Sequence, residues 1–280
     1  MKFGLDVGTA GRFSDARLLA GLAADAEAAG WDGFFIWDIL LGGSQTAPEP
    51  VVDPWVALTA IALATSRIRF GAFMTPLPRR RPWDVARCVA SLDRLSGGRI
   101  ILGAGLGYQQ DEFAAIGEDT AAAVRAGKLD EGLAIIDQLW RGQPVTFTGQ
   151  HYRFGPAAIL PTPYQEPRVP VWTAAGWPRR RPLHRAARWD GTYLMTVNQE
   201  TRELLRPDEV AAIHDYLTGL RGDAGSFDIA INGDISHAGQ PADAVARYER
   251  AGATWWVELC SDTPEQERDR IRQGPPRRKP

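Results

Sequence analysis

The sequence is poor in the residues from which disulfide scaffolds, metal centres and lysine-based active sites are made. Its two cysteines, Cys88 and Cys260, belong to no Cys-x-x-Cys pair, so neither a disulfide framework nor a zinc site is expected. Only three lysines occur, Lys2, Lys128 and Lys279, and no cluster of metal ligands accompanies them. These absences argue against a lyase or hydrolase that uses a lysine base or a metal ion on a phosphorylated substrate.

Long apolar segments are also missing. No run approaches the roughly 20 residues that span a bilayer. The first residues, Met1 to Phe3, lead into an alternating segment and not into the apolar stretch of a signal peptide. The formal net charge of −2 argues against a nucleic-acid-binding or membrane-surface role for the whole molecule. We therefore expect a cytoplasmic protein whose partner is a small molecule and whose arginine clusters bind small anions.

What the sequence does contain is a regular alternation of strand and helix patterns. The predicted strands cover 2–8, 32–37, 68–73, 99–105, 169–174, 191–196, 227–232 and 254–259. The predicted helices cover 15–29, 54–65, 82–96, 120–140, 178–188, 207–221, 240–251 and 263–273. Eight strands alternating with eight helices favour a closed (β/α)₈ (TIM) barrel, an α/β fold, over an open doubly wound sheet.

Two segments fall outside this alternation. Residues 39–53 are predicted as a loop after the second strand, and 142–167 as a β-hairpin insertion ahead of the fifth strand. The barrel domain is expected to cover 1–273, with 274–280 as a flexible tail. Because strand side chains alternate, one of the neighbours Trp255 and Trp256 should face the barrel interior and the other the helices.

The ends of two neighbouring strands are unusually bare of side chains. The segment 71–107 reads GAFMTPLPRRRPWDVARCVASLDRLSGGRIILGAGLG, with small residues at both strand ends. One explanation is tight packing between elements, since a single Gly-x-Gly-x-Gly is weak evidence. The other is a cofactor that lies across the carboxyl ends of the strands.

The pentapeptide PRRRP occurs twice, at 78–82 and at 178–182, each time at the start of a predicted helix. Each copy combines several guanidinium groups with the free N–H groups of a helix start, which favours anion binding. Two solvated basic loops are the alternative. The small residues Ala174, Ala175 and Gly176 before the second copy favour a phosphate site there.

Motifs along nearly the whole chain resemble those of the bacterial-luciferase-like oxidoreductases, a barrel family whose members use flavin mononucleotide (FMN) or the deazaflavin coenzyme F420. The matching motifs are GWDGFFIWD at 30–38, DPWVAL at 53–58, RIRFGAFMTPLPRRRPW at 67–83, LDRLSGGRIILGAGLG at 92–107, LDEGLAIIDQLWRG at 129–142, VPVWTAAGWPRRRPLHRAARWDG at 169–191 and AGATWWVE at 251–258.

The resemblance implies a set of cofactor-binding positions. In this family the third strand ends in a bulge with a non-prolyl cis peptide behind the flavin ring, which corresponds here to 71–74 and places the cis bond at Ala72–Phe73. The implied cofactor-binding residues are Asp38, Gly71, Ala72, Phe73, Met74, Gly105, Leu106, Gly107, Tyr108, Ala174, Ala175, Gly176, Trp177 and Arg179. No metal site is expected.

One departure concerns proton transfer. Relatives commonly carry a histidine directly after the aspartate that ends strand two, whereas this chain has Ile39 after Asp38. Isoleucine cannot exchange a proton, as an imidazole near neutral pH can. The remaining catalytic candidates are Asp38, Tyr108 and His237, together with Glu112.

The sequence therefore predicts an F420-dependent oxidoreductase that transfers hydride to or from a small organic substrate. F420 carries an acidic oligoglutamate tail, which the arginines 79–81 could attract. An FMN-dependent monooxygenase is the alternative. A barrel that binds cofactor, or merely folds, without turnover is a third reading, motivated by Ile39. Relatives also lead us to expect a homodimer.

Overall fold

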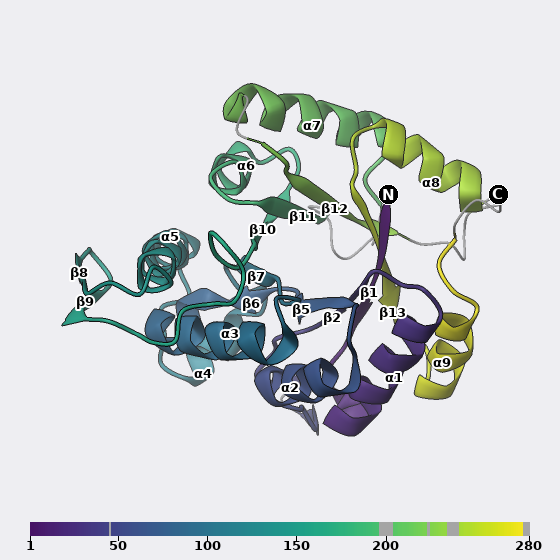
Figure 1. The fold of residues 1–280 in the computed structure, drawn as a ribbon, viewed down its shortest axis with the longest axis horizontal. Coiled ribbons are helices and arrows are strands. Elements are labelled where there is room, and N and C mark those ends of the chain that lie inside the picture. Colours follow the sequence, from purple (N-terminus) through teal and green to yellow (C-terminus); the bar gives the residue numbers. More distant parts are fainter. Residues whose placement is uncertain (45, 196–203, 223–224, 234–240, 277–280) are drawn as a thin grey trace.

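The computed structural model describes residues 1–44, 46–195, 204–222, 225–233 and 241–276, and it has the predicted parallel barrel (Figure 1). A nine-stranded sheet runs in the order β5-β2-β1-β13-β12-β11-β10-β7-β6. Its strands are β1 (Lys2–Val7), β2 (Gly33–Ile36), β5 (Arg69–Ala72), β6 (Thr75–Pro76), β7 (Leu102–Gly105), β10 (Val171–Gly176), β11 (Gly191–Met195), β12 (Asp228–Gly233) and β13 (Trp255–Cys260).

The sheet closes because β5 and β6 are two halves of one interrupted barrel strand. The N–H of Phe70 donates to the carbonyl of Arg99 (3.3 Å), and the N–H of Ile101 donates to Phe70 (2.9 Å). β5 thus meets the residues that lead into β7, while β6 pairs with the end of β7 through Thr75 and Ala104. Eight barrel strands and the predicted closure are confirmed.

Helices surround this barrel, with α7 and α8 on one side in Figure 1 and α1, α2 and α3 on the other. They are α1 (Ala16–Ala28), α2 (Pro54–Ala64), α3 (Pro82–Ser96), α5 (Ala122–Leu139), α6 (Arg180–Ala186), α7 (Pro207–Arg221), α8 (Pro241–Arg250) and α9 (Pro264–Arg272). Asp15 and Asp53 cap the first two by accepting from N–H groups of the first turn, and Gly97 ends α3 in the left-handed conformation (φ 66°).

The connections contain more structure than the sequence pattern predicted. The segment 39–53, expected as a loop, forms a small hairpin of β3 (Gly42–Ser44) and β4 (Ala47–Glu49), with short 3₁₀ turns at Gly11–Phe13 and Leu77–Arg79 elsewhere. A short helix α4 (Gln110–Ala115) precedes α5. The hairpin ahead of the fifth barrel strand is confirmed as β8 (Val145–Thr148) and β9 (Arg153–Ala157).

The barrel interior is an aromatic floor distinct from the larger core between strands and helices. Phe35 and Phe73 stack with ring centroids 3.8 Å apart, and Trp172 and Trp255 meet edge to face at 5.4 Å. Trp255 belongs to this inner cluster and Trp256 to the outer core, as the alternation predicted. Among the described residues, no helix has the length and apolar character needed to cross a membrane.

Candidate active site

The carboxyl ends of β6, β7 and β10 bring together the segments predicted to hold the cofactor. These ends form the mouth, the face at which TIM-barrel enzymes carry their active sites. A Cβ atom added to Gly105 would lie 3.1 Å from the Cβ of Met74 and 3.8 Å from that of Ala174. The three predicted stretches, 71–74, 105–108 and 174–179, therefore border one another at the mouth.

The predicted bulge is present, but its cis peptide lies one residue later than expected. The non-prolyl cis bond joins Phe73 to Met74, so the prediction of Ala72–Phe73 was wrong. Ala72 still pairs with Ile36 on β2, and the N–H of Phe73 still donates to the carbonyl of Ile36 (2.8 Å). The backbone hydrogen bonding between this strand and β2 thus continues through the N–H of Phe73, and the strand is interrupted after that residue.

The glycines at the ends of these strands are required for two different reasons. A Cβ on Gly71 would lie 2.2 Å from the carbonyl oxygen of Ile101, and one on Gly103 would lie 2.2 Å from that of Ala72. Backbone packing between neighbouring strands accounts for both glycines. At Gly105 the three atoms nearest to an added Cβ belong to the side chains of Met74 and Ala174, so a side chain there would enter the space between these residues at the mouth.

The loop after β7 is held from beneath by Arg125. Its Nη1 donates to the carbonyl of Gly107 (2.8 Å) and to that of Leu106 (3.4 Å), and its guanidinium lies over the ring of Phe113 at 4.8 Å. Gly107 has a positive φ of 82°, and Tyr108 after it is exposed. The loop is thus a fixed backbone that presents Tyr108 to solvent.

The second arginine cluster, 179–181, follows the end of β10 and is exposed. A cis Trp177–Pro178 bond joins it to the strand. Arg180 lies over the rings of Trp177 (4.7 Å) and Tyr216 (4.1 Å). Within the described ranges, no carboxylate forms a salt bridge with these three arginines, so their charge is available at the mouth.

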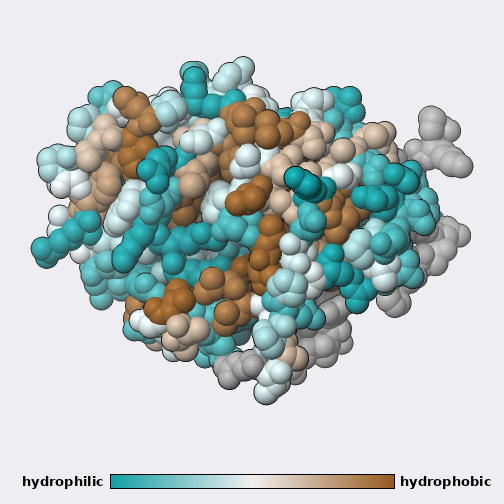
Figure 2. All heavy atoms as spheres, turned by 90° about the horizontal axis from the view of Figure 1, so that it is seen from below, coloured by the Kyte–Doolittle hydropathy of each residue, from teal (hydrophilic) through white to brown (hydrophobic). Residues whose placement is uncertain are grey.

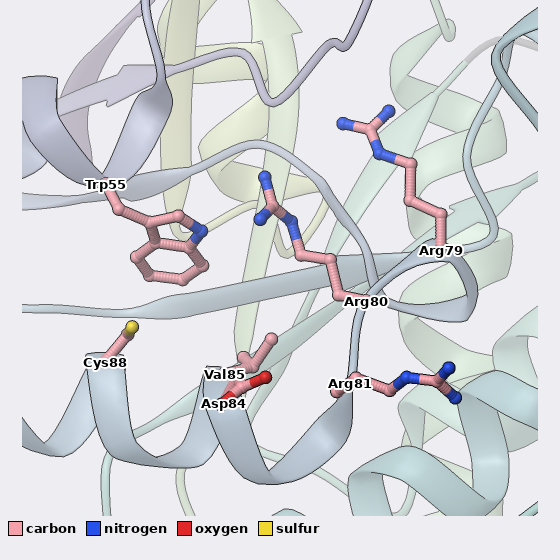
Figure 3. A pocket seen from close by; sticks show the side chains of 7 residues that line it. All are labelled: Trp55, Arg79, Arg80, Arg81, Asp84, Val85 and Cys88. Carbon is pink, nitrogen blue, oxygen red and sulfur yellow. The ribbon is translucent and has the colours of Figure 1, made fainter. Parts of the chain in front are cut away.

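The first arginine cluster is different, because Asp38 occupies it. The carboxylate of Asp38 is buried and accepts from Nη2 of Arg79 (2.6 Å) and from Nε and Nη2 of Arg80 (2.8 and 2.7 Å). Arg80 also lies over the ring of Trp55 at 5.6 Å. Figure 3 shows Arg80 extending towards Trp55, while Arg81 points away from it. The predicted cofactor-side carboxylate is thus clamped between two guanidinium groups.

Glu112 joins this cluster from α4. It pairs with Arg79 and accepts from the backbone N–H groups of Leu40 (2.5 Å) and Leu41 (3.1 Å). The side chains of Arg79 and Glu112 are 4% and 3% exposed. This buried network ties the loop after β2 to the 3₁₀ turn that precedes α3 and to α4.

The histidines add no acid–base group to the described part of the mouth. His237 lies outside the described residues. His151 packs against α5, His184 hydrogen-bonds the hydroxyl of Tyr216 at 2.8 Å, and His214 packs against the turn after α8.

A polar group that the sequence interpretation missed, Asp6, lies inside the barrel beside the aromatic floor, in register with Phe35. Burial raises the pKa of Asp6 to about 7, and interactions with the side chains of Trp37 and Tyr193 offset only part of this effect. The Tyr193 hydroxyl is 3.3 Å from Oδ2 of Asp6 and also contacts Oδ1 of Asn232. The available signal was the alternation in β1, which places Asp6 on one face with Gly4 and Gly8.

Comparisons with known proteins agree with this architecture. An F420-dependent hydroxymycolic acid dehydrogenase of Mycobacterium tuberculosis is 34% identical over 165 residues, which are 58% of this chain and 45% of that protein. An F420-dependent glucose-6-phosphate dehydrogenase of Kineococcus radiotolerans is 31% identical over 232 residues, covering 81% of this chain and 66% of that protein. The chain thus spans about half to two thirds of the length of these curated relatives.

The solved structure of an F420-dependent secondary alcohol dehydrogenase, in complex with an F420–acetone adduct, superposes with a TM-score of 0.78. It covers 98% of both chains at 16% identity, which shows a shared fold. The family model of luciferase-like monooxygenases matches residues 2–278, and the chain belongs to this family of oxidoreductases.

Proposed function

We propose that this protein is an F420-dependent oxidoreductase that transfers hydride between the deazaflavin and a small organic substrate. The observation that carries the proposal is the exposed cluster 179–181, which forms no salt bridge with the described residues, beside the end of β10 at Ala174, Ala175 and Gly176. Both curated relatives described above are F420-dependent dehydrogenases by name.

The residues at the mouth fit such a cofactor. Gly105, Met74 and Ala174 offer a surface of small or flexible side chains to a planar ring. Exposed guanidinium groups at 179–181 offer charge-assisted hydrogen bonds to a phosphate. When bound, the cofactor would supply the hydride chemistry, and the protein would orient the ring and exclude water.

The distribution of charge at the mouth also bears on where an acidic tail would bind. Arg79 and Arg80 are already paired with Asp38 and Glu112. Of the first cluster, only Arg81 is exposed and without a salt bridge among the described residues. We therefore propose that the carboxylates of F420 meet 179–181, with at most a contribution from Arg81.

Cofactor binding by a charge-reversed variant tests the proposal. We expect micromolar wild-type protein to quench F420 fluorescence, and the double variant Arg179→Glu, Arg181→Glu to bind at least about 30-fold more weakly. The matched control is Arg247→Glu, Arg250→Glu, which makes the same charge change on α8, near the end of the barrel where the strands begin. Equal quenching by all three proteins would contradict the proposal. Retention of yellow FMN with no F420 binding would favour the flavin monooxygenase instead.

We further propose that the protein works as a cytoplasmic homodimer. Val56 and Leu63 on α2 are exposed and seven residues apart, so they share one helix face. Figure 2, which looks from below, shows hydrophobic side chains gathered on the face that this helix occupies. The two free cysteines suit a reducing compartment. Sedimentation velocity of wild type and Leu63→Lys tests the dimer: the wild type should sediment as a dimer and the variant as a monomer.

A further inference from the structure

We propose that Asp6, held by Tyr193, is the acid–base residue of this barrel and exchanges a proton with the substrate. The inference rests on the proposed function, because it assigns the proton step of that same hydride-transfer site. It also supplies a group for the task that Ile39 cannot perform.

The position of Asp6 in the barrel supports this role. Asp6 pairs with Phe35 on β2 and with Leu259 on β13, and its side chain is directed to the interior, where the hydroxyl of Tyr193 on β11 meets it. The same hydroxyl also contacts Oδ1 of Asn232 on β12. Gly8, the residue that follows β1 on the same face, has no side chain, and the ring of Trp37 lies 3.7 Å from the place where its Cβ would be. The carboxyl group is therefore buried inside the barrel, with no further side chain of its own strand between it and the carboxyl ends of the strands.

The hydrogen bonding of the carboxyl group leaves one oxygen unused. Oδ2 faces the hydroxyl of Tyr193, and the side chain of Trp37 lies close enough to lower the pKa of the carboxyl group. Oδ1 is buried and, within the described ranges, forms no hydrogen bond of good geometry. A buried polar atom without a partner is unfavourable and calls for an explanation. A substrate oxygen or nitrogen at the mouth would provide the missing partner.

The surroundings of Asp6 keep both protonation states accessible near neutral pH. Burial raises its pKa to about 7, and no cation among the described residues forms a salt bridge with it. The titratable group that faces it is the hydroxyl of Tyr193, whose pKa is raised by burial and by the Asp6 charge. The thiol of Cys260 on β13 lies on the outer face of the sheet, and its pKa is raised by burial and by Glu267. Both stay neutral in the range where Asp6 exchanges its proton.

Asp38, the other buried carboxylate near the mouth, is bound differently. Both of its oxygens accept from Arg79 and Arg80. Asp38 is thus a charged anchor for two guanidinium groups, and Asp6 is the carboxyl group with an unoccupied oxygen.

The proton step balances in both directions. For a carbonyl substrate, the carbon accepts a hydride, which the reduced deazaflavin supplies when bound, and the carbonyl oxygen takes the proton from Oδ1 of Asp6. The C=O π bond is reduced to an alcohol, and Asp6 is left as a carboxylate whose Oδ2 accepts from Tyr193. In alcohol oxidation Asp6 takes the hydroxyl proton as the hydride leaves.

Infrared difference spectroscopy on the full chain tests the acid directly, without cofactor. The wild type should have a protonated-carboxyl band that is lost as the pH rises through about 7. Asp6→Asn should lack the band, and Tyr193→Phe should shift its titration to higher pH, because a donor to the carboxylate is removed. Asp228→Asn makes the same chemical change at the start of β12 and should retain the wild-type band.

Kinetics with F420 test the catalytic role, provided that circular dichroism and thermal melting show each variant to be folded. Asp6→Asn should bind F420 as the wild type does, lower kcat by about 10²- to 10⁴-fold, and lose the limb of the pH–rate profile near 7. Tyr193→Phe should keep that limb and move it upwards.

The outcomes separate the two claims. A wild type that has the carboxyl band but binds no F420 overturns the proposed function, and the catalytic role of Asp6 with it. A wild type that binds F420 while Asp6→Asn retains both its kcat and its pH profile overturns the inference alone. Absence of the carboxyl band at pH 6 also overturns it.

Discussion

The same pentapeptide, PRRRP, occurs twice in this barrel with opposite surroundings. At 78–82, Arg79 and Arg80 are drawn into a buried network with Asp38 and Glu112. At 178–182 the three arginines are exposed, and no carboxylate in the described part of the chain pairs with them. One copy therefore stabilises the fold, and the other is available to a ligand.

The two copies differ in the residues that lie next to them in the folded chain. Strand β2, the neighbour of β5, ends at Ile36, two residues before Asp38, and this aspartate reaches the first copy. The second copy follows Ala174, Ala175 and Gly176, which carry no charge. A basic motif is thus an anion site only where the protein itself has not supplied the anion.

Removing one arginine from each copy should separate the two roles most strongly. Arg79→Ala leaves buried carboxylates without a partner and should lower the free energy of unfolding by about 3–5 kcal/mol. Arg179→Ala, at an exposed position, should change it by less than about 0.5 kcal/mol. Urea denaturation measures both. Similar small losses for the two variants would refute the division of roles.

A third acidic group, Asp6, extends the comparison because no guanidinium group in the described ranges forms a salt bridge with it. Its pKa is about 7 in the folded protein against an ordinary value of 3.8, so the folded state binds more protons between these values. The stability that Asp6 contributes is present below about pH 4 and is lost as the pH rises through about 7.

Asp6→Asn cannot ionise and escapes this loss. Relative to wild type, its free energy of unfolding should therefore rise between pH 4 and pH 7.5, by up to about 4 kcal/mol. Denaturation series at the two pH values measure the change. A constant difference between variant and wild type would mean that Asp6 has an ordinary pKa.

An added negative charge at the second copy should weaken cofactor binding without affecting the first. Gly176→Asp places a carboxylate before Arg179, and we expect F420 affinity to fall about 10- to 100-fold. Gly219→Asp on α7, where an added Cβ meets nothing within 4 Å, is the matched control. Fluorescence titration measures both. Equal affinities would place the phosphate elsewhere.

Salt should produce the smallest effect, again at only one copy. The exposed arginines 179–181 are open to screening, so raising the ionic strength from about 0.05 M to about 0.5 M should weaken F420 binding several-fold. The buried network of Arg79 is screened less, and the melting temperature should hardly change. A salt-independent affinity would argue against an exposed arginine site.

Much of the fold could be predicted from periodicity, because each strand and helix carries its own local pattern. The eight barrel strands and the hairpin of β8 and β9 followed from it. The hairpin of β3 and β4 and the helix α4 did not, because their short sequences lack a clear repeat. The interruption of the third barrel strand comes after Phe73, one residue later than expected. The reason is that Ala72 still pairs with Ile36 and the N–H of Phe73 still donates to the carbonyl of Ile36.

The site was less predictable, because its decisive contacts join distant residues. Asp38 was predicted as a cofactor-side carboxylate, but its contact with Arg79 spans 41 positions in the sequence and depends on how the loops fold back. Asp6 was missed, because alternation along β1 groups it with Gly4 and Gly8 without stating which face of the strand is inside. The roles predicted for Asp38, Tyr108 and His237 stay predictions.

A crystal structure with F420 soaked into the protein would show where the cofactor binds. We expect the phosphate within hydrogen-bond distance of the arginines 179–181, and the ring against Met74 and Gly105. A phosphate bound at Arg79 and Arg80, or a ring outside the mouth, would contradict this expectation.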